Sequence, residues 1–136
     1  LSIYAMRRPA FSFIVRQQQR TVTVQTAGGP RSFKVRNTNE LLGEKGITGI
    51  KTGTTSAAGP CLATCVKRDP LLRDAPDGNK LVTPRRLVVV VLGSPDRFGH
   101  TRTLIQRGWG LFDGWMAAGA PSEDPRREFL QVPDPR

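Results

Sequence analysis

The sequence predicts an α+β (α/β) domain in which helices flank a mostly antiparallel five-stranded sheet. Its 136 residues are enough for one compact domain and too few for two. Hydrophobic residues make up 38% of the chain, and 14 glycines and 11 prolines indicate a folded chain with many turns. Segments with a period of two residues follow one another through short turns, and helical patterns precede and follow them.

The chain opens with helices and a hairpin. Residues 1–8 are typical of a helix end, and Pro9 suits the first turn of a second helix that runs to residue 15. Residues 21–25 and 31–36 alternate between apolar and polar side chains, as strands do when one face is buried. The Ala-Gly-Gly-Pro stretch between them is typical of a turn, so the two strands are predicted to form a β-hairpin.

The hairpin is expected to bury apolar side chains, and a capped turn is expected after it. Val22 and Val24 share one face, and Phe33 and Val35 are predicted to point inward. Residues 37–42 then predict a short capped turn of helix that closes at the following glycine.

Three further strands complete the predicted sheet. Residues 47–54 form a third strand that glycine interrupts, and residues 60–67 form a fourth. Residues 69–83 contain proline, aspartate and glycine in a pattern typical of a polar loop. Residues 86–92 are apolar without alternation, which indicates a strand buried on both faces.

A last helix is predicted after Gly93, because apolar residues recur there at helical spacing. These residues are Leu104, Leu111, Phe112 and Trp115. The chain is rich in proline and charge from residue 118 onward. The sequence therefore predicts a domain over residues 1–117 and a linker or tail over residues 118–136.

Charge and cysteine content exclude several classes of site. The net charge of +10 favours polyanionic partners in general. Nucleic acid is not expected as a partner, because Arg and Lys are spread along the chain and do not cluster with aromatic residues. Cys61 and Cys65 lie on one predicted strand about 13 Å apart, which is too far for a disulfide. One histidine and no third thiol also argue against a metal site.

One strand end carries a pattern suited to binding a peptide. Alternation places Thr52 and Thr54 on a common face, and Lys51 adds positive charge beside it. Gly53 has no side chain, so an extended peptide backbone can approach this strand closely. The residues together suit a peptide that ends in a carboxylate.

Two other interpretations of this segment fit it less well. A phosphate-binding loop needs glycine before its lysine and a helix after it, whereas Ile50 precedes Lys51 and the chain continues as strand. An isolated Lys-Thr-Gly would also fit a plain glycine-rich connection between strands. The pattern around the tripeptide is longer, however.

Several segments carry that longer pattern. They are Tyr4-Ala5-Met6, Pro9-Ala10-Phe11, Asn37-Thr38-Asn39 with Leu41-Leu42, the stretch from Gly49 to Thr55, Ala58-Gly59 with Cys61-Leu62-Ala63, the stretch from Arg86 to Gly93, and Arg102, Leu104 and Trp109-Gly110. In these residues the chain resembles the serine-type D-alanyl-D-alanine carboxypeptidases, which are low-molecular-weight penicillin-binding proteins. The resemblance implies the C-terminal portion of a catalytic domain with the serine β-lactamase and penicillin-binding-protein (transpeptidase-like) fold.

The resemblance also implies a role for each residue of the strand end. Lys51 resembles the lysine that binds substrate and sets the field of the cleft. Thr52 resembles the hydroxyl that bonds the terminal D-alanine carboxylate, and Gly53 resembles the residue that keeps the strand open to the peptide. The backbone N–H of Thr54 resembles one of two oxyanion-hole donors.

Two other elements of the family, Ser-x-x-Lys and Ser-x-Asn, are absent from this sequence. Ser94 comes nearest, with Arg97 three residues later, but arginine cannot act as a neutral base. In the family both elements lie upstream of the helices with which this chain opens, so we expect the missing N-terminal part of the same domain as its partner. An arginine after the buried strand often helps hold the carboxylate, and Arg97 and Arg102 are both candidates.

The implied activity is covalent catalysis outside the cytoplasmic membrane, in the periplasm or cell wall. A serine attacks the D-Ala-D-Ala bond of a peptidoglycan stem peptide, and water releases the acyl-enzyme. β-Lactam antibiotics would enter the same cleft of the full-length protein, and no metal or organic cofactor is needed. The chain alone is expected to be inactive. Endopeptidase activity stays open as an alternative to carboxypeptidase activity.

Three alternative interpretations fit the sequence less well. The chain could be a stand-alone, non-catalytic module that binds peptidoglycan, which its basic charge and exposed Lys-Thr-Gly strand would suit. A β-lactamase relative fits the unbroken run over residues 37–63 less well. His100 with Ser94 and Asp96 could suggest a triad, but three neighbours on one loop rarely have that geometry, and a surface or loop-bridging histidine is expected.

Overall fold

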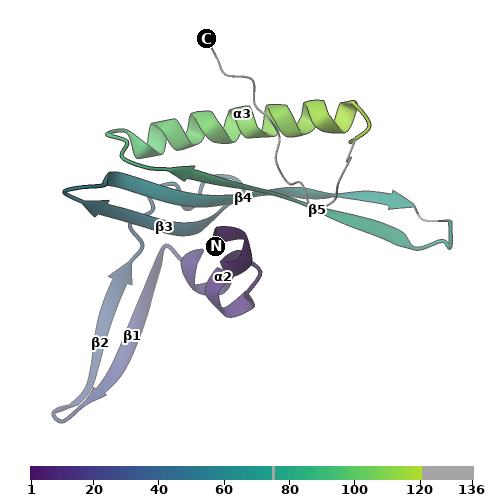
Figure 1. The fold of residues 1–136 in the computed structure, drawn as a ribbon. Coiled ribbons are helices and arrows are strands. Elements are labelled where there is room, and N and C mark those ends of the chain that lie inside the picture. Colours follow the sequence, from purple (N-terminus) through teal and green to yellow (C-terminus); the bar gives the residue numbers. More distant parts are fainter. Residues whose placement is uncertain (75, 121–136) are drawn as a thin grey trace.

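The structure is a computed structural model that describes residues 1–74 and 76–120. The part of the predicted tail from residue 121 onward lies outside the described residues. The described chain has the predicted α+β class, but its strands form two antiparallel sheets, of two and three strands. The prediction of one five-stranded sheet was wrong in this respect. Figure 1 shows the hairpin standing away from the other strands.

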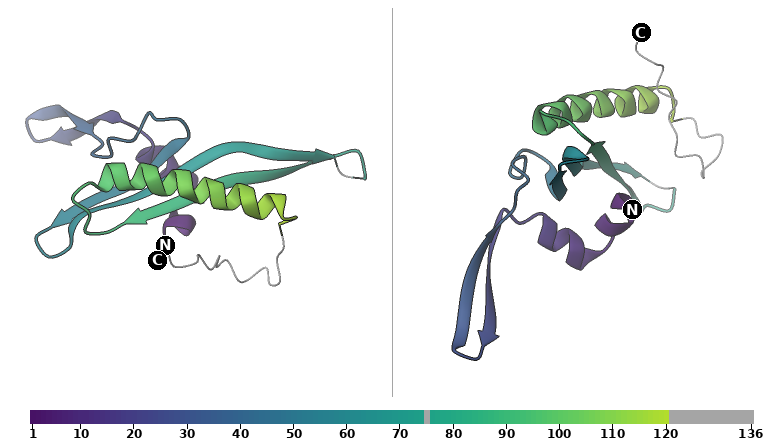
Figure 2. Two further views of the ribbon diagram at one scale, coloured as in Figure 1. Left: turned by 90° about the horizontal axis from the view of Figure 1, so that it is seen from above. Right: turned by 60° about the vertical axis from the view of Figure 1, so that its left-hand side comes forward.

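Two short helices open the chain, as predicted, and they lie under the three-stranded sheet. Helix α1 spans Ser2–Met6, and helix α2 spans Pro9–Val15 with proline at its first position. Met6 and two sheet residues, Ile50 and Cys65, form a buried cluster. The right-hand view of Figure 2 shows these helices on one side of the sheet and α3 on the other.

The hairpin consists of strand β1, Gln19–Thr26, and strand β2, Gly29–Arg36. Its apolar side chains are exposed, which contradicts the inward orientation predicted for Phe33 and Val35. Their exposed fractions are both 53%, and those of Val22 and Val24 are 40% and 42%. The alternation of apolar and polar residues correctly predicted two strands with one apolar face. No other described element packs on that face.

A loop without helix connects β2 to the three-stranded sheet, so the predicted turn of helix was wrong. Side chains close this loop instead. Asn37 Oδ1 accepts the Asn39 N–H at 3.0 Å, and Asn39 Oδ1 accepts the Leu41 N–H at 3.1 Å. Asparagine side chains commonly replace helical hydrogen bonds in this way. Gly43, at which the turn was predicted to close, lies in the left-handed region, but the loop continues to Gly46 before β3 begins.

Strand β3, Ile47–Thr55, pairs antiparallel with strand β4, Gly59–Asp74, which pairs with strand β5, Lys80–Val91. The register of β3 shifts between Ile47 and Ile50, where glycine was predicted to interrupt it. Gly49 lies there with φ +113°, and a Cβ on it would come within 2.9 Å of Val15. Only glycine allows α2 to approach the sheet so closely.

Strands β4 and β5 extend far beyond β3 as a two-stranded ribbon, where a polar loop was predicted. Of the two prolines that suggested a loop, Pro70 lies at an irregularity of this ribbon, and Pro76 lies in the turn between its strands. The register shifts between Arg68 and Leu71, so Pro70 falls in the shift, and Pro84 lies opposite it on the outer strand of the sheet. Proline cannot donate to a ladder and is tolerated at such places.

Strand β5 is buried on one face, not on both as predicted. Val89 and Val91 are each 7% exposed, whereas Val90 and Leu92 are 52% and 74% exposed. Helix α3 covers the first face along its length, while α1 and α2 are too short to cover the second (Figures 1 and 2). The sequence cannot distinguish the buried face of this strand from its exposed face, because apolar residues occupy both.

Helix α3, Arg97–Ala117, follows β5 as predicted and packs on β4 and β5. Its buried centre is Trp109, 4% exposed, which meets Phe112 edge-on at 5.7 Å. Arg68 of β4 lies over the Trp109 ring at 4.3 Å. Leu104 and Leu111 are about two-fifths exposed, so the apolar pattern predicted the helix but not its buried side. No helix within the described residues has both the length and the apolarity to cross a bilayer.

Candidate functional site

The predicted site residues lie at the end of β3, on the outer strand of the three-stranded sheet. Thr52 pairs with Leu62 and Thr54 with Pro60, so both threonines point to the face that α3 covers. The common face predicted for them is therefore confirmed. Their surroundings differ, because Thr52 is 8% exposed and Thr54 is open to solvent.

Lys51 and Gly53 belong to the other face of β3. Lys51 pairs with Ala63, whose side chain packs on the cluster beneath the sheet. The Lys51 ammonium turns back to donate to the carbonyl oxygen of Thr52. At Gly53 a Cβ would meet nothing within 4 Å, so the strand surface is open there. These two residues leave room beside the strand for an extended chain.

Arg97, the first residue of α3, brings a fixed charge to this strand. Its Nη1 donates to the carbonyl oxygen of Gly53 at 3.3 Å and to Thr54 Oγ1 at 3.1 Å. The preceding Asp96 caps the helix by accepting the Gly99 N–H at 2.9 Å. A capped helix start on a packed sheet gives Arg97 a firm base, so its guanidinium is held at the strand end.

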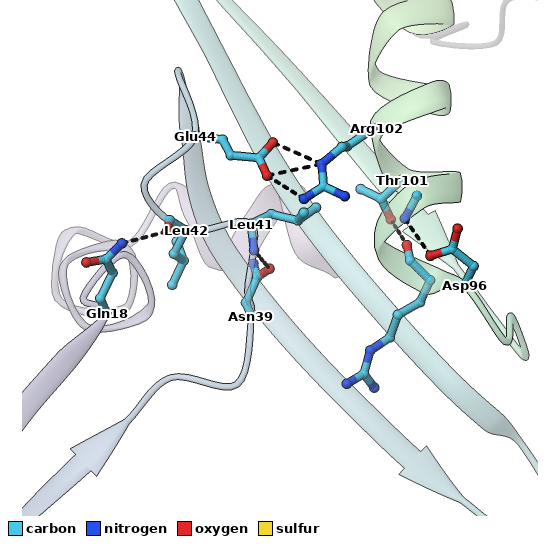
Figure 3. Close-up of polar contacts among 10 residues, drawn as sticks. Gln18, Asn39, Leu41, Leu42, Glu44, Asp96, Thr101 and Arg102 are labelled. Atoms are coloured by element: carbon cyan, nitrogen blue, oxygen red, sulfur yellow. Dashed lines mark hydrogen bonds and ion pairs between the residues drawn. The ribbon is translucent and has the colours of Figure 1, made fainter.

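Arg102 turns to a different partner. It donates twice to Glu44, with Nη2 at 2.6 Å and Nε at 3.1 Å from Oε1, as Figure 3 shows. The hydrogen bonds that Arg102 donates to Glu44 are the main reason that the pKa of its guanidinium is raised. Of the two arginines that the sequence left open, Arg97 is the one that reaches the Lys-Thr-Gly strand.

Thr38 is a site residue that the sequence-based assignment missed. Its hydroxyl is hydrogen-bonded to the hydroxyl of Thr52. The preceding residue helps to hold Thr38 there, since Asn37 Nδ2 donates to the carbonyl oxygens of Val15 and Gln17 at 3.1 and 3.2 Å. The Asn-Thr-Asn pattern marked this loop in the sequence, but nothing in the pattern states which strand its threonine meets.

A polar cavity of about 670 Å³ opens beside Thr38. Arg36 and Arg97 contribute positive charge to its wall, and Glu40 contributes negative charge. Thr38 also lines it, while Thr52 stands behind Thr38. A cavity with two guanidinium groups and a hydroxyl suits a ligand that carries a carboxylate.

His100, expected to lie on the surface or to bridge a loop, is exposed and bridges the loop after β5 to α3. His100 Nδ1 lies 2.6 Å from Ser94 Oγ, and Ser94 is 6% exposed. The Asp96 carboxylate is engaged as the helix cap instead of facing the imidazole. The contact ties the end of β5 to the first turn of α3, next to Arg97.

The cysteines and acidic residues present no further centre in the part of the chain that is described. Cys61 and Cys65 are free thiols on β4, Cys65 buried and Cys61 half-buried. Within residues 1–74 and 76–120, no three His, Cys, Asp or Glu side chains gather as metal ligands would.

Comparison with solved structures assigns the chain to the class of DD-peptidases and penicillin-binding proteins. The resemblance found in the sequence is thereby confirmed at the level of this class. No protein-family model and no curated protein sequence matches the chain.

Two proteins illustrate the match. The Streptomyces K15 DD-transpeptidase, solved as a single-residue mutant, is 27% identical with a TM-score of 0.59, and the alignment covers 77% of this chain. Penicillin-binding protein D2 from Listeria monocytogenes, in its cefotaxime-bound form, is 28% identical with a TM-score of 0.53 over 79% of this chain. The chain spans only 38% and 37% of the length of these two solved chains.

Proposed function

We propose that the chain forms the Lys-Thr-Gly side of the cleft of a serine D-Ala-D-Ala carboxypeptidase. The substrate is the D-alanyl-D-alanine terminus of a peptidoglycan stem peptide. One observation carries the proposal: Arg97 is anchored on the same strand end that holds Lys51, Thr52 and Thr54. A cation and hydroxyls at the edge of an open strand suit a peptide that ends in a carboxylate.

The chemistry needs a nucleophile from outside this sequence, which contains no Ser-x-x-Lys. That serine oxygen attacks the carbonyl carbon between the two D-alanines, and the C–N bond breaks. The departing D-alanine takes a proton on its amine, and water then hydrolyses the serine ester. The roles predicted for this chain are binding by Lys51, Thr52 and Gly53 and stabilisation of the oxyanion by the Thr54 N–H.

Water as the acceptor of the acyl group distinguishes a carboxypeptidase from a transpeptidase, which uses an amine. The unbroken carboxypeptidase-like pattern over residues 37–63 supports the hydrolytic outcome. The cefotaxime bound to the Listeria protein supports β-lactams as ligands of the complete cleft. A substrate in the cell wall supports a location outside the cytoplasmic membrane.

The first test measures ligand binding by the chain itself. We expect amide resonances of β3 in the ¹⁵N-labelled chain to shift with N-acetyl-D-Ala-D-Ala and to stay in place with N-acetyl-L-Ala-L-Ala. Replacing Lys51 with methionine, an unbranched side chain that is shorter by one heavy atom and has no charge, should weaken binding about tenfold. Equal shifts with both stereoisomers would sink the proposed substrate.

A second test addresses catalysis. A fluorescent penicillin is expected to leave the isolated chain unlabelled after denaturing electrophoresis, because the required serine is absent. Covalent labelling of the wild-type chain would show that it contains its own nucleophile, and the proposed division of the cleft would be wrong.

The peptidoglycan-binding module is a second candidate, favoured by the distribution of charge. Residues 1–39 contain seven basic residues and no acidic one, and the exposed hairpin carries four of the seven. Retention of the chain on purified peptidoglycan, unaffected by Lys51→Met but lost when the hairpin arginines are replaced, would favour this function over the cleft.

A further inference from the structure

The cavity at the candidate site has walls from two parts of the fold that no β-ladder joins within the described chain. Gln18, Gln19 and Arg36 line it at the base of the hairpin, and Arg97 lines it from the first turn of α3. The hairpin is a sheet of its own, whereas α3 packs on β4 and β5 of the other sheet. The width of the cavity therefore depends on the connecting loop, residues 37–46, which lies between the two walls (Figure 3).

The hairpin side holds this loop through Gln18, the residue before β1. Its Nε2 donates to the Leu42 carbonyl oxygen at 2.6 Å. The fit is close, because Gly43 has φ +105° and a Cβ on it would lie 2.5 Å from Gln18 Nε2. Leu42 is 6% exposed, so this contact holds a buried part of the loop.

The α3 side holds the loop through Arg102. Its Nη2 and Nε donate to Glu44 Oε1 at 2.6 and 3.1 Å, and a contact by two N–H groups fixes orientation as well as distance. An exposed ion pair adds little to the stability of a fold, so the value of this one lies in the geometry that it imposes. Arg102 is little more than one helical turn from Arg97, and a contact that places Arg102 therefore also places Arg97.

The two contacts lie at the ends of one short segment, residues 42–44, which we call the tie. The tie connects the base of the hairpin to α3, and these are the two sides between which the cavity opens. Neither Glu44 nor Arg102 lines the cavity. Their ion pair can therefore affect a ligand only through the position of the walls.

We infer that Glu44 and Arg102 are positioning residues, which hold α3 at a fixed distance and orientation from the base of the hairpin through the tie and so set the width of the cavity. The identity of the ligand rests on the proposed function, whereas the position of the walls can be measured without a ligand. The inference gives Arg102 a role at the site that needs no contact with substrate.

The experiment compares this ion pair with a second exposed ion pair of the same helix. Glu44→Gln removes the charge at nearly constant volume. Asp113→Asn is the matched control, because Asp113 pairs with Arg68 at 2.8 Å toward the other end of α3. Exchanging the partners, Glu44→Arg with Arg102→Glu, restores an ion pair of opposite direction.

Two quantities are measured on each ¹⁵N-labelled variant. Residual dipolar couplings of the amides in residues 39–42 and in α3 give the orientation of the loop relative to the helix. Titration with N-acetyl-D-Ala-D-Ala gives the dissociation constant. Urea denaturation checks that the variants being compared are equally stable.

In the wild type and in Asp113→Asn, the couplings of the loop and of α3 should fit one relative orientation. In Glu44→Gln we expect them to be reduced by averaging, and the dissociation constant should rise about threefold to tenfold. The exchanged variant should recover the couplings and bind within about twofold of the wild type. The urea midpoints of Glu44→Gln and Asp113→Asn should be similar, because both lose one exposed ion pair.

Unchanged couplings in Glu44→Gln would overturn the inference whether or not the chain binds the peptide, because other contacts would then hold the walls. An equal loss of binding in Glu44→Gln and Asp113→Asn would also overturn it, since any exposed ion pair of α3 would then have the same effect. If the couplings change as expected and the wild-type chain does not bind the peptide, the role of the tie is confirmed and the proposed function alone fails.

Discussion

At the scale of single residues, two buried threonines differ in what their hydroxyls meet. Thr64 and Thr101 are each 0% exposed. Thr101 Oγ1 donates to the carbonyl oxygen of Arg97 at 2.6 Å, whereas Thr64 Oγ1 has no hydrogen-bond partner among the described residues. A buried polar group without a partner costs about 1–3 kcal/mol.

Valine in place of Thr64 is therefore expected to stabilise the fold. It removes the unpaired hydroxyl at almost constant volume in a strand, where valine is favoured. We expect the free energy of unfolding to rise by about 1 kcal/mol, measured by urea denaturation. Thr101→Val is the matched control and should lower it by a similar amount, because a satisfied hydrogen bond is lost. A loss of stability in both variants would mean that Thr64 has a partner after all.

Asp77 provides a pH-dependent contact at the tip of the β4–β5 ribbon. The side chain of Asn79 donates to it at 2.8 Å and the Asn79 backbone N–H at 3.0 Å, which lowers the pKa of Asp77 below its ordinary value of 3.8. A lowered pKa means that the contact stabilises the turn above the unfolded pKa and is lost as the pH falls through the folded one.

Asn79→Ala should move the pKa of Asp77 upward, because the larger of the two hydrogen bonds disappears while the backbone bond remains. The carboxyl ¹³C shift of Asp77, followed between about pH 2 and pH 6 around the ordinary carboxyl range, measures it. An unchanged midpoint would show that the side-chain hydrogen bond does not persist in solution.

Single residues were also where the sequence was most and least informative about the site. Lys51, Thr52, Gly53 and Thr54 could be placed on one strand end because strand alternation is local. The sequence could not show which arginine, Arg97 or Arg102, reaches the site. The two lie little more than one helical turn apart on α3, and only the packing of the helix decides which of them faces β3. Thr38 was missed for the same reason: its partner Thr52 is 14 residues away.

At the scale of elements, α3 has glycines that differ in what surrounds them. A Cβ on Gly114 would meet nothing within 4 Å, whereas a Cβ on Gly108 would lie 2.8 Å from Leu87 Cδ2. Glycine inside a helix costs roughly 0.5–1 kcal/mol relative to alanine.

Gly114→Ala is accordingly expected to raise the free energy of unfolding by about 0.5–1 kcal/mol. Gly108→Ala gains the same helix propensity but must displace Leu87, so its net effect should be smaller or unfavourable. Thermal denaturation of both variants compares them directly. Equal stabilisation by the two substitutions would contradict the close packing of α3 on β5.

The hairpin is the element with the fewest supports. It contacts the body through its base, where Gln18 Nε2 donates to the Leu42 carbonyl at 2.6 Å and Asn37 Nδ2 donates to the Val15 carbonyl at 3.1 Å. An isolated two-stranded hairpin is marginally stable in water. We expect its amides to exchange with deuterium much faster than those of β4 between Leu62 and Val66. Comparable protection would show that another surface covers the hairpin in solution.

Element types followed from the sequence better than element surroundings did. The two opening helices, five strands and the last helix were all predicted, because periodicity is a local signal. The number of sheets was not, since the hairpin pattern does not say what its apolar face meets. The β4–β5 ribbon was not predicted, because Pro70 and Pro76 are both typical of loops, whereas Pro70 lies at a register shift within the ribbon and only Pro76 lies in its turn.

At the scale of the whole molecule, charge and apolar surface are concentrated in the same part of the chain. Residues 1–39 contain seven basic residues and no acidic residue. The rest of the chain contains the other 14 basic residues and all 11 acidic residues. Large apolar side chains of α1, α2 and the hairpin are also exposed, among them Tyr4 at 60% and Ile14 at 56%.

This combination predicts association that depends on salt. At about 10 mM salt the Debye length is about 30 Å, so the positive charges on different copies of the chain should repel one another. At about 1 M salt the Debye length is about 3 Å, so this repulsion should be screened. We expect light scattering after size exclusion to give the mass of the 14.9 kDa monomer at low salt and larger species at high salt. A monomer at both salt concentrations would show that the exposed apolar residues are too dispersed to associate.

The register shift around Pro70 has a consequence for how this chain can vary in length. In the outer part of the ribbon, from Leu71↔Thr83 to Asp74↔Lys80, β4 pairs with β5 alone. The register shift separates this part from the strand pairs next to the site. Codons added or removed two at a time on each side of Gly78 would lengthen or shorten this arm without turning any side chain over. The gene can therefore tolerate large size changes here while β3, the loop at Thr38 and the start of α3 keep their mutual positions.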